Sequence, residues 1–156
     1  MARHRTSPQT RPGLVVSGHG RRVTILDDAG ETWSASLRRR QIVVTGDRVQ
    51  WRKVAPGQGI VESIEPREGV LARPDENGRQ RIMAANLDLV VVTFASVPAI
   101  SDLALDAYLV AAEHLDIDAI LVMNKCDQPD TGSRGIRGRA ERYAQAGYQT
   151  LNVSAH

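Results

Sequence analysis

The sequence has 156 residues, of which 42% are hydrophobic and 24% are charged, enough for one or two small globular domains. It contains neither a long apolar stretch nor a signal-peptide pattern, so we expect no membrane association and a cytoplasmic protein. A single cysteine, Cys126, excludes an internal disulfide and a cysteine-rich zinc site, which fits a reducing compartment.

Charge is distributed unevenly along the chain. Residues 1–85 carry 15 Lys and Arg against 9 Asp and Glu, a net charge of +6, whereas residues 86–156 carry 5 against 9, a net charge of −4. The two values sum to the +2 of the whole chain. This asymmetry predicts a basic module for a polyanion joined to an acidic module, with residues 1–12 as a flexible basic arm.

The basic half contains five short runs with β-branched residues and partial alternation, separated by Gly, Asp and Pro turn signals. They predict strands over residues 13–18, 21–27, 31–37, 47–54 and 59–64. Five such strands in so short a segment favour an OB-type β barrel over residues 13–66, a fold that often binds nucleic acid. An SH3-like barrel is the alternative.

Five arginines are candidate RNA contacts: Arg21 and Arg22 at the first turn, and Arg38, Arg39 and Arg40 in the loop after the third strand. The planar guanidinium donates two hydrogen bonds to a phosphate at once, which suits this role. Trp33 and Trp51 can either stack on bases or fill the barrel. In so small a core, we favour the core position for both indoles.

Residues 67–86 show little periodicity and contain breakers such as Pro74 and Gly78, so we interpret them as a linker. Beyond them the pattern predicts a strand at 87–94, a helix that Ser101 caps and that runs to about Leu115, a strand at 119–123, a helix at 136–146 and a strand at 148–154. Four residues share one apolar face of the first helix: Leu103, Ala107, Val110 and Ala111. This alternation predicts an α/β domain of the doubly wound kind, incomplete, over residues 87–156.

The tetrapeptide Asn124-Lys125-Cys126-Asp127 directly follows the predicted strand at 119–123 and has the pattern of a guanine-recognition box. At the carboxyl end of a strand, Asp127 can accept hydrogen bonds from the ring N–H and the exocyclic amine of guanine, a pair of donors that adenine lacks. Asn124 would tie the loop to neighbouring backbone, and the Lys125 stem would cover the purine face. Taken alone, the four residues also fit a solvated turn.

A second pattern supports the guanine site. Ser154 and Ala155 end the next predicted strand, and in nucleotide-binding GTPases a Ser-Ala dipeptide at this point offers a backbone N–H to the guanine oxygen. The sequence contains no G-x-x-x-x-G-K-[ST] phosphate loop. We therefore expect GTP or GDP to be held through its guanine part only, with no magnesium or zinc ligands in this chain.

Several motifs in this order resemble the RsgA (YjeQ, EngC) family of ribosome small subunit-dependent GTPases: Gly13-Leu-Val-Val-Ser-Gly18, Val44-Thr-Gly-Asp-Arg-Val49, Ile60-Val-Glu-Ser-Ile-Glu-Pro-Arg67, Ala84-Ala-Asn-Leu-Asp-Leu-Val-Val-Val92 and the Asn124 to Asp127 box. The resemblance extends from about residue 12 onward. It implies an N-terminal OB barrel, then a circularly permuted GTPase domain whose guanine boxes precede its phosphate loop, then a zinc domain. It also implies a monomer that binds the 30S subunit and its rRNA during late assembly and hydrolyses GTP there.

The resemblance carries five residues over as guanine contacts: Asn124, Lys125, Asp127, Ser154 and Ala155. It carries over no catalytic residue, so we interpret the chain as the N-terminal portion of such a GTPase and expect it not to turn over GTP alone. We also expect the half from residue 87 onward to be less stable than the barrel, or to self-associate. The alternatives are a stand-alone RNA-binding OB module with a vestigial nucleotide domain, and a small nucleotide-binding domain unrelated to ribosomes.

Overall fold

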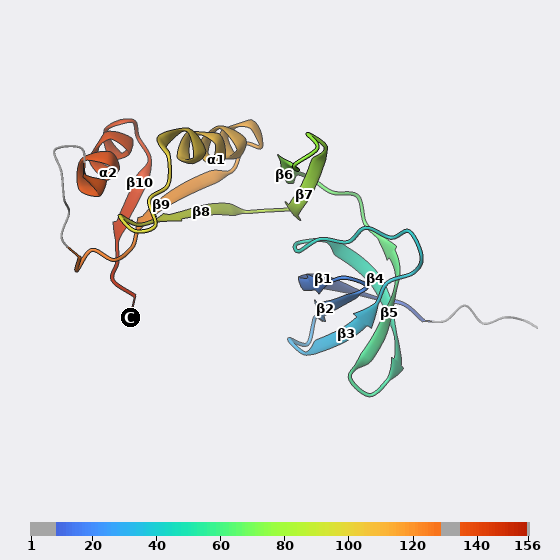
Figure 1. Ribbon diagram of the computed structural model, residues 1–156. Coiled ribbons are helices and arrows are strands. Elements are labelled where there is room, and N and C mark those ends of the chain that lie inside the picture. Colours follow the sequence, from blue (N-terminus) through green and yellow to red (C-terminus); the bar gives the residue numbers. More distant parts are fainter. Residues whose placement is uncertain (1–8, 129–134, 156) are drawn as a thin grey trace, which may run out of the picture. The chain divides into compact units, whose positions relative to one another are not determined.

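The structure is a computed structural model that describes residues 9–128 and 135–155. The chain divides into two compact units, the first ending at Leu87 and the second beginning at Asp88 (Figure 1). Among the described residues, no helix is long and apolar enough to cross a membrane.

The first unit contains a closed barrel of five strands: β1 (Arg11–His19), β2 (Arg22–Leu26), β3 (Thr32–Ser36), β4 (Arg48–Ala55) and β5 (Gln58–Ile64). The strand order is β1-β2-β3-β5-β4, and β4 returns to pair with β1. Only the pairing of β3 with β5 is parallel. This connectivity confirms the predicted OB-type barrel.

Both tryptophans lie in the barrel core. Trp51 is fully buried and its ring centroid is 5.2 Å from that of Trp33. Each indole N–H has an acceptor inside the first unit, because Trp51 donates to the Pro12 carbonyl at 3.1 Å and Trp33 donates to Asp27 at 2.9 Å. Gly13 packs so closely on Trp51 that an added Cβ would lie 2.7 Å from the indole nitrogen. The indoles therefore stabilise the barrel and are not exposed for base stacking.

The segment interpreted as a linker contains a hairpin that the sequence analysis did not predict. Strands β6 (Val70–Pro74) and β7 (Gln80–Ala85) pair antiparallel. Asp75 closes the turn between them, since its carboxylate accepts the backbone N–H groups of Asn77 and Arg79, both at 2.9 Å. The hairpin belongs to the first unit.

The second unit is a three-stranded parallel sheet in the order β10-β9-β8, with two helices: β8 (Leu89–Phe94), α1 (Asp102–His114), β9 (Asp118–Met123), α2 (Ile136–Gln145) and β10 (Gln149–Asn152). Ser101 caps α1 as predicted, accepting the Ala104 N–H at 3.1 Å. The two helices contact each other through the Tyr143 hydroxyl, which donates to Asp106 at 2.7 Å. One face of the sheet is thus covered by both helices.

The buried face of α1 differs from the apolar face that the sequence analysis described. Leu105, Leu109 and Ala112 are buried, whereas Leu103, Ala107 and Val110 are exposed and Ala111 is half-buried. The helix carries two apolar stripes, and the sheet covers only one of them. The strand β8 shows the same one-sided burial, because Val90, Val92 and Phe94 are buried while its alternate residues are exposed.

Candidate functional site

The Asn124 loop lies at the carboxyl end of the central strand β9. Two backbone hydrogen bonds of 2.8 Å fix it there, one from the Asn124 N–H to Phe94 at the end of β8 and one from the Val153 N–H to Met123. The Asn124 side-chain oxygen accepts the N–H groups of Lys125 at 2.7 Å and Ala155 at 3.1 Å. Asn124 therefore ties its own loop to the loop that follows β10.

Asp127 and Ser154 connect the same two loops. The Ser154 hydroxyl donates to Asp127, and the Cys126 N–H donates to the Val153 carbonyl at 3.2 Å. Both Asp127 and Ser154 are exposed at this end of the sheet. The Asp127 carboxylate is thus held at the carboxyl end of the sheet, where open α/β sheets bind ligands. Its position is set by Ser154, which lies 27 positions away in the sequence.

Lys125 is oriented by a third segment. Its backbone has a positive φ of 59°, and its ammonium group donates to the Val97 carbonyl at 2.7 Å. The lysine stem consequently crosses from the Asn124 loop to the segment after β8. The structure brings together all five residues that the sequence analysis named, in two loops at the ends of adjacent parallel strands.

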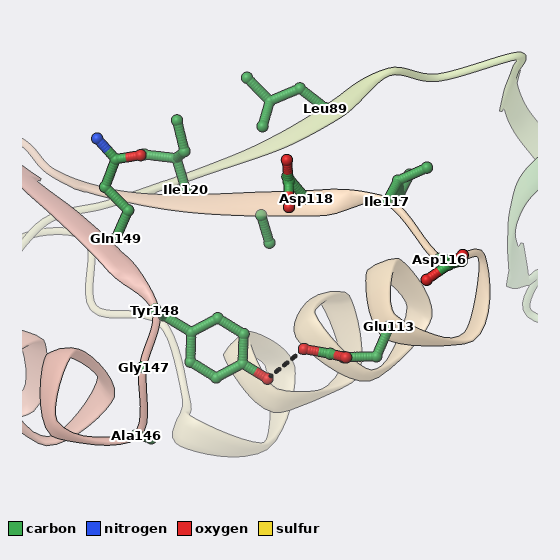
Figure 2. A pocket seen from close by; sticks show the side chains of 11 residues that line it. Leu89, Glu113, Asp116, Ile117, Asp118, Ile120, Ala146, Gly147, Tyr148 and Gln149 are labelled. Atoms are coloured by element: carbon green, nitrogen blue, oxygen red, sulfur yellow. Dashed lines mark hydrogen bonds between the residues drawn. The ribbon is translucent and has the colours of Figure 1, made fainter.

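A hollow of about 470 Å³ in the described part of the second unit lies at the opposite end of the sheet, where β8, β9 and β10 begin (Figure 2). Acidic side chains line it, including Glu113, Asp116 and Asp118. Figure 2 shows the Tyr148 hydroxyl directed at Glu113, a hydrogen bond of 3.3 Å, and burial together with this carboxylate raises the pKa of Tyr148. An acidic hollow repels phosphate groups, so it does not suit a nucleotide.

Comparison with known proteins shows the family of the chain. The sequence profile of the RsgA GTPase family matches residues 64–156. The chain belongs to the RsgA GTPase family. Small ribosomal subunit biogenesis GTPase RsgA of Pseudomonas putida is 38% identical over 150 residues, which are 92% of this chain and 44% of that protein. The protein of the same name from Mannheimia succiniciproducens is 36% identical over 152 residues, 94% of this chain and 43% of its own length.

Solved structures support the same RsgA fold. YjeQ from Thermotoga maritima has a TM-score of 0.65 and 28% identity, covering 94% of this chain and 52% of that one. YloQ, a circularly permuted GTPase, has a TM-score of 0.63 and covers 99% of this chain and 55% of its own. At 24% identity it supports the fold alone. The chain thus spans less than half the length of the RsgA relatives it matches by sequence.

The candidate RNA contacts of this RsgA-family chain lie on the barrel unit. Arg21 and Arg22 lie at the β1–β2 turn, and Arg39 and Arg40 lie in the loop after β3, all four exposed. Arg38 differs, because it forms an ion pair with Glu62, which also binds Arg52 at 2.7 Å. The pairing partner is 24 residues away, so no local pattern indicates that Arg38 is neutralised.

Further arginines of the basic unit were missed because they lie in the segment interpreted as a linker: Arg73, Arg79 and Arg81. All three are exposed on or beside the β6–β7 hairpin. A usable signal was present, since Asp75 and Asn77-Gly78 form a turn pattern between two short runs. The hairpin therefore adds positive charge to the same unit as the barrel loops.

Proposed function

We propose that this chain supplies the RNA-binding barrel and the guanine-recognition half of a small ribosomal subunit biogenesis GTPase of the cytoplasm. The observation that carries the proposal is the mutual fixing of two loops, in which Asn124 bonds to Ala155 and Ser154 bonds to Asp127 at adjacent strand ends. The names of the RsgA relatives support the ribosomal part, and the exposed barrel arginines support an RNA partner.

The guanine site is tested by the identity of the base. The Asp127 carboxylate accepts hydrogen bonds, so it selects guanine, which presents an exocyclic amine as a donor. In xanthine an oxygen replaces this amine. We expect Asp127→Asn to lower the affinity for GDP and raise the affinity for xanthosine diphosphate, because the amide presents a donor to that oxygen. The neighbouring exposed Gln128 provides the matched control, Gln128→Ala. Equal GDP binding by both variants in calorimetry would contradict the site.

The phosphates should contribute little to binding by these 156 residues, which contain base-reading residues and no phosphate-loop motif. We therefore expect GTP and GDP to bind weakly and with similar affinity, and neither to be hydrolysed. Calorimetry and a phosphate-release assay measure both. Tight GTP binding, or turnover that Asp127→Ala abolishes, would show a phosphate site elsewhere in the chain.

The RNA-binding role is tested on the barrel loops. Reversing Arg39 and Arg40 to Glu should weaken binding to small-subunit rRNA and reduce the salt dependence of the affinity, because fewer counterions are released. Asp127→Ala should change neither quantity. If the RNA result holds and the xanthine exchange fails, the chain is better described as an RNA-binding module, the second candidate that the basic barrel favours.

A further inference from the structure

The connection between β8 and α1, residues 95–101, is held by two cations that come from elsewhere in the second unit. Lys125, in the Asn124 loop, donates to the Val97 carbonyl at 2.7 Å. Arg139, on α2, donates to the Ile100 carbonyl at 2.6 Å. Both hydrogen bonds have a charged donor and are therefore stronger than those between neutral groups. The guanine loop and the helix that follows it are thus joined to the same connection.

The Arg139 guanidinium makes a second contact beside the first. It forms an ion pair with Asp102, the first residue of α1, with 2.8 Å between Nε and Oδ1. Only 22% of the Arg139 side chain is exposed. Because the guanidinium is planar and rigid, it holds its two partners in a fixed relative orientation. Arg139 therefore fixes the end of the connection and the start of α1 relative to α2.

The Val97 carbonyl lies between two fixed points of the chain. On one side the Asn124 N–H donates to the Phe94 carbonyl at 2.8 Å, which attaches the end of β8 to the guanine loop. On the other side Arg139 holds Ile100. The middle of the connection is exposed, with Val97 at 65%. Exposed segments with few packed neighbours open easily, so the position of the Val97 carbonyl depends on these two ends.

We propose that Arg139 is a positioning residue for the guanine site, which acts through residues 95–101 to hold Lys125 with its stem over the purine. The inference rests on the proposed guanine site and adds to it a residue outside both guanine loops. A lysine that is free to rotate loses conformational entropy when a base packs against its stem. A lysine already held by the Val97 carbonyl loses less, so the base binds more tightly.

The variant Arg139→Gln removes the guanidinium from the connection. We expect the affinity for GDP, measured by calorimetry, to fall about fivefold, part of the roughly tenfold or more that one charge-assisted hydrogen bond contributes. The matched control is Arg142→Gln on the same helix, which removes an equal charge. Arg142 pairs with the same Asp102 at 3.4 Å and is 59% exposed, so its loss should leave GDP affinity nearly unchanged.

Two further measurements separate positioning from loss of structure. Inosine diphosphate lacks the exocyclic amine that Asp127 accepts, so Arg139→Gln should keep the full preference for GDP over inosine diphosphate. Local unfolding of the guanine loops would lower that preference. Lys125→Met keeps most of the stem and removes the ammonium group. In the Lys125→Met background, Arg139→Gln should therefore cost no further affinity, because the residue through which it acts is no longer held.

Three outcomes are distinguishable. If Arg139→Gln alone weakens GDP binding, and the loss disappears in the Lys125→Met background, the positioning role is supported. The role is overturned, and the guanine site stands, if Asp127→Asn exchanges guanine for xanthine but Arg139→Gln matches Arg142→Gln. The same holds if the loss persists in the Lys125→Met background or the preference for GDP over inosine diphosphate falls. If the unsubstituted chain binds no GDP, or Asp127→Asn leaves GDP binding unchanged, the guanine site and the positioning role are both overturned.

Discussion

The two units differ in whether their sheets have strands with an unpaired edge. In the barrel every strand has two neighbours, since β4 closes on β1, and the pairing leaves no open edge. The sheet of the second unit has β8 and β10 at its edges, and the helices cover one face of it. On the other face Val91 is 54% exposed and Leu151 is 44% exposed.

This difference determines how much apolar surface each unit exposes. Parallel sheets are generally buried on both faces, so an exposed face with apolar side chains is a surface for association. The barrel instead buries its apolar residues inside and carries exposed arginines on its loops. The first unit therefore keeps its apolar side chains inside the closed barrel, whereas the second unit leaves apolar side chains exposed on one face of its sheet.

Removing the central indole should produce the largest effect. Trp51→Ala should destabilise the barrel by roughly 3–5 kcal/mol, because the fully buried ring also contacts Trp33. Val54→Ala on the same strand should cost less than about 0.5 kcal/mol, since that side chain is 51% exposed. Urea unfolding followed by circular dichroism measures both free energies of unfolding. Equal costs for the two variants would contradict the closed core.

One added methyl group should strongly weaken the contact between the hairpin and the barrel. Gly46→Ala should destabilise the first unit by about 1–3 kcal/mol, through strain at positive φ and displacement of Ala85. The control is Gly78→Ala at the hairpin turn, which has a φ of 72° and nothing within 4 Å of the added carbon. Hydrogen exchange should show lost protection in β7 for the first variant only. Similar losses would assign the effect to backbone strain alone.

The exposed sheet face should mediate weak association. Val91→Lys should raise the dissociation constant for self-association about tenfold, since one apolar side chain contributes roughly 1.5–3 kcal/mol when buried. Val54→Lys on the barrel, a residue of similar exposure, is the control. Sedimentation equilibrium measures the constants. A chain that stays monomeric at high concentration before substitution would show that this face does not self-associate.

Local patterns were sufficient for much of the fold. Alternation and turn residues predicted the five barrel strands, and the Ser101 cap and the run before Asn124 predicted α1 and β9. The hairpin escaped prediction because its strands are short, polar and without a core of their own. They are ordered by contacts with Thr45 and Gly46, some 40 residues away, which no local pattern reveals.

The same limit applies to the candidate sites. The Asn124 box was visible because its residues are adjacent in sequence and follow a strand. The pairing of Arg38 with Glu62 and the opposition of Arg73 to Arg81 depend on register, and register is set by turns and by the barrel closure. The buried stripe of α1 was likewise undetermined, because the helix offers two apolar faces and only the packing selects one.

The smallest expected effects are changes in stability with pH. They should occur at acid pH in the barrel and at alkaline pH in the second unit. In the barrel, the Glu31 backbone N–H donates to Asp27 at 2.9 Å and, with the Trp33 indole, lowers the pKa of Asp27. A lowered folded-state pKa gives stability that is present above the unfolded value near pH 3.8 and is lost as the pH falls through the folded value. In the second unit, burial and the hydrogen bond to Asp106 raise the pKa of Tyr143 to about 12.

For Tyr143 the sign is reversed. A raised pKa gives stability that is present below the unfolded value near pH 10 and is lost as the pH rises through about 12. Asp27→Asn should therefore flatten the acid side of the barrel's stability profile, and Tyr143→Phe should flatten the alkaline side of the second unit's profile. Hydrogen exchange corrected for intrinsic rates can follow the acid side, and urea unfolding followed by circular dichroism at a series of pH values can follow the alkaline side. If Asp27→Asn flattened the alkaline side, or Tyr143→Phe the acid side, the two hydrogen bonds would not be the source of the pH dependence in their own units.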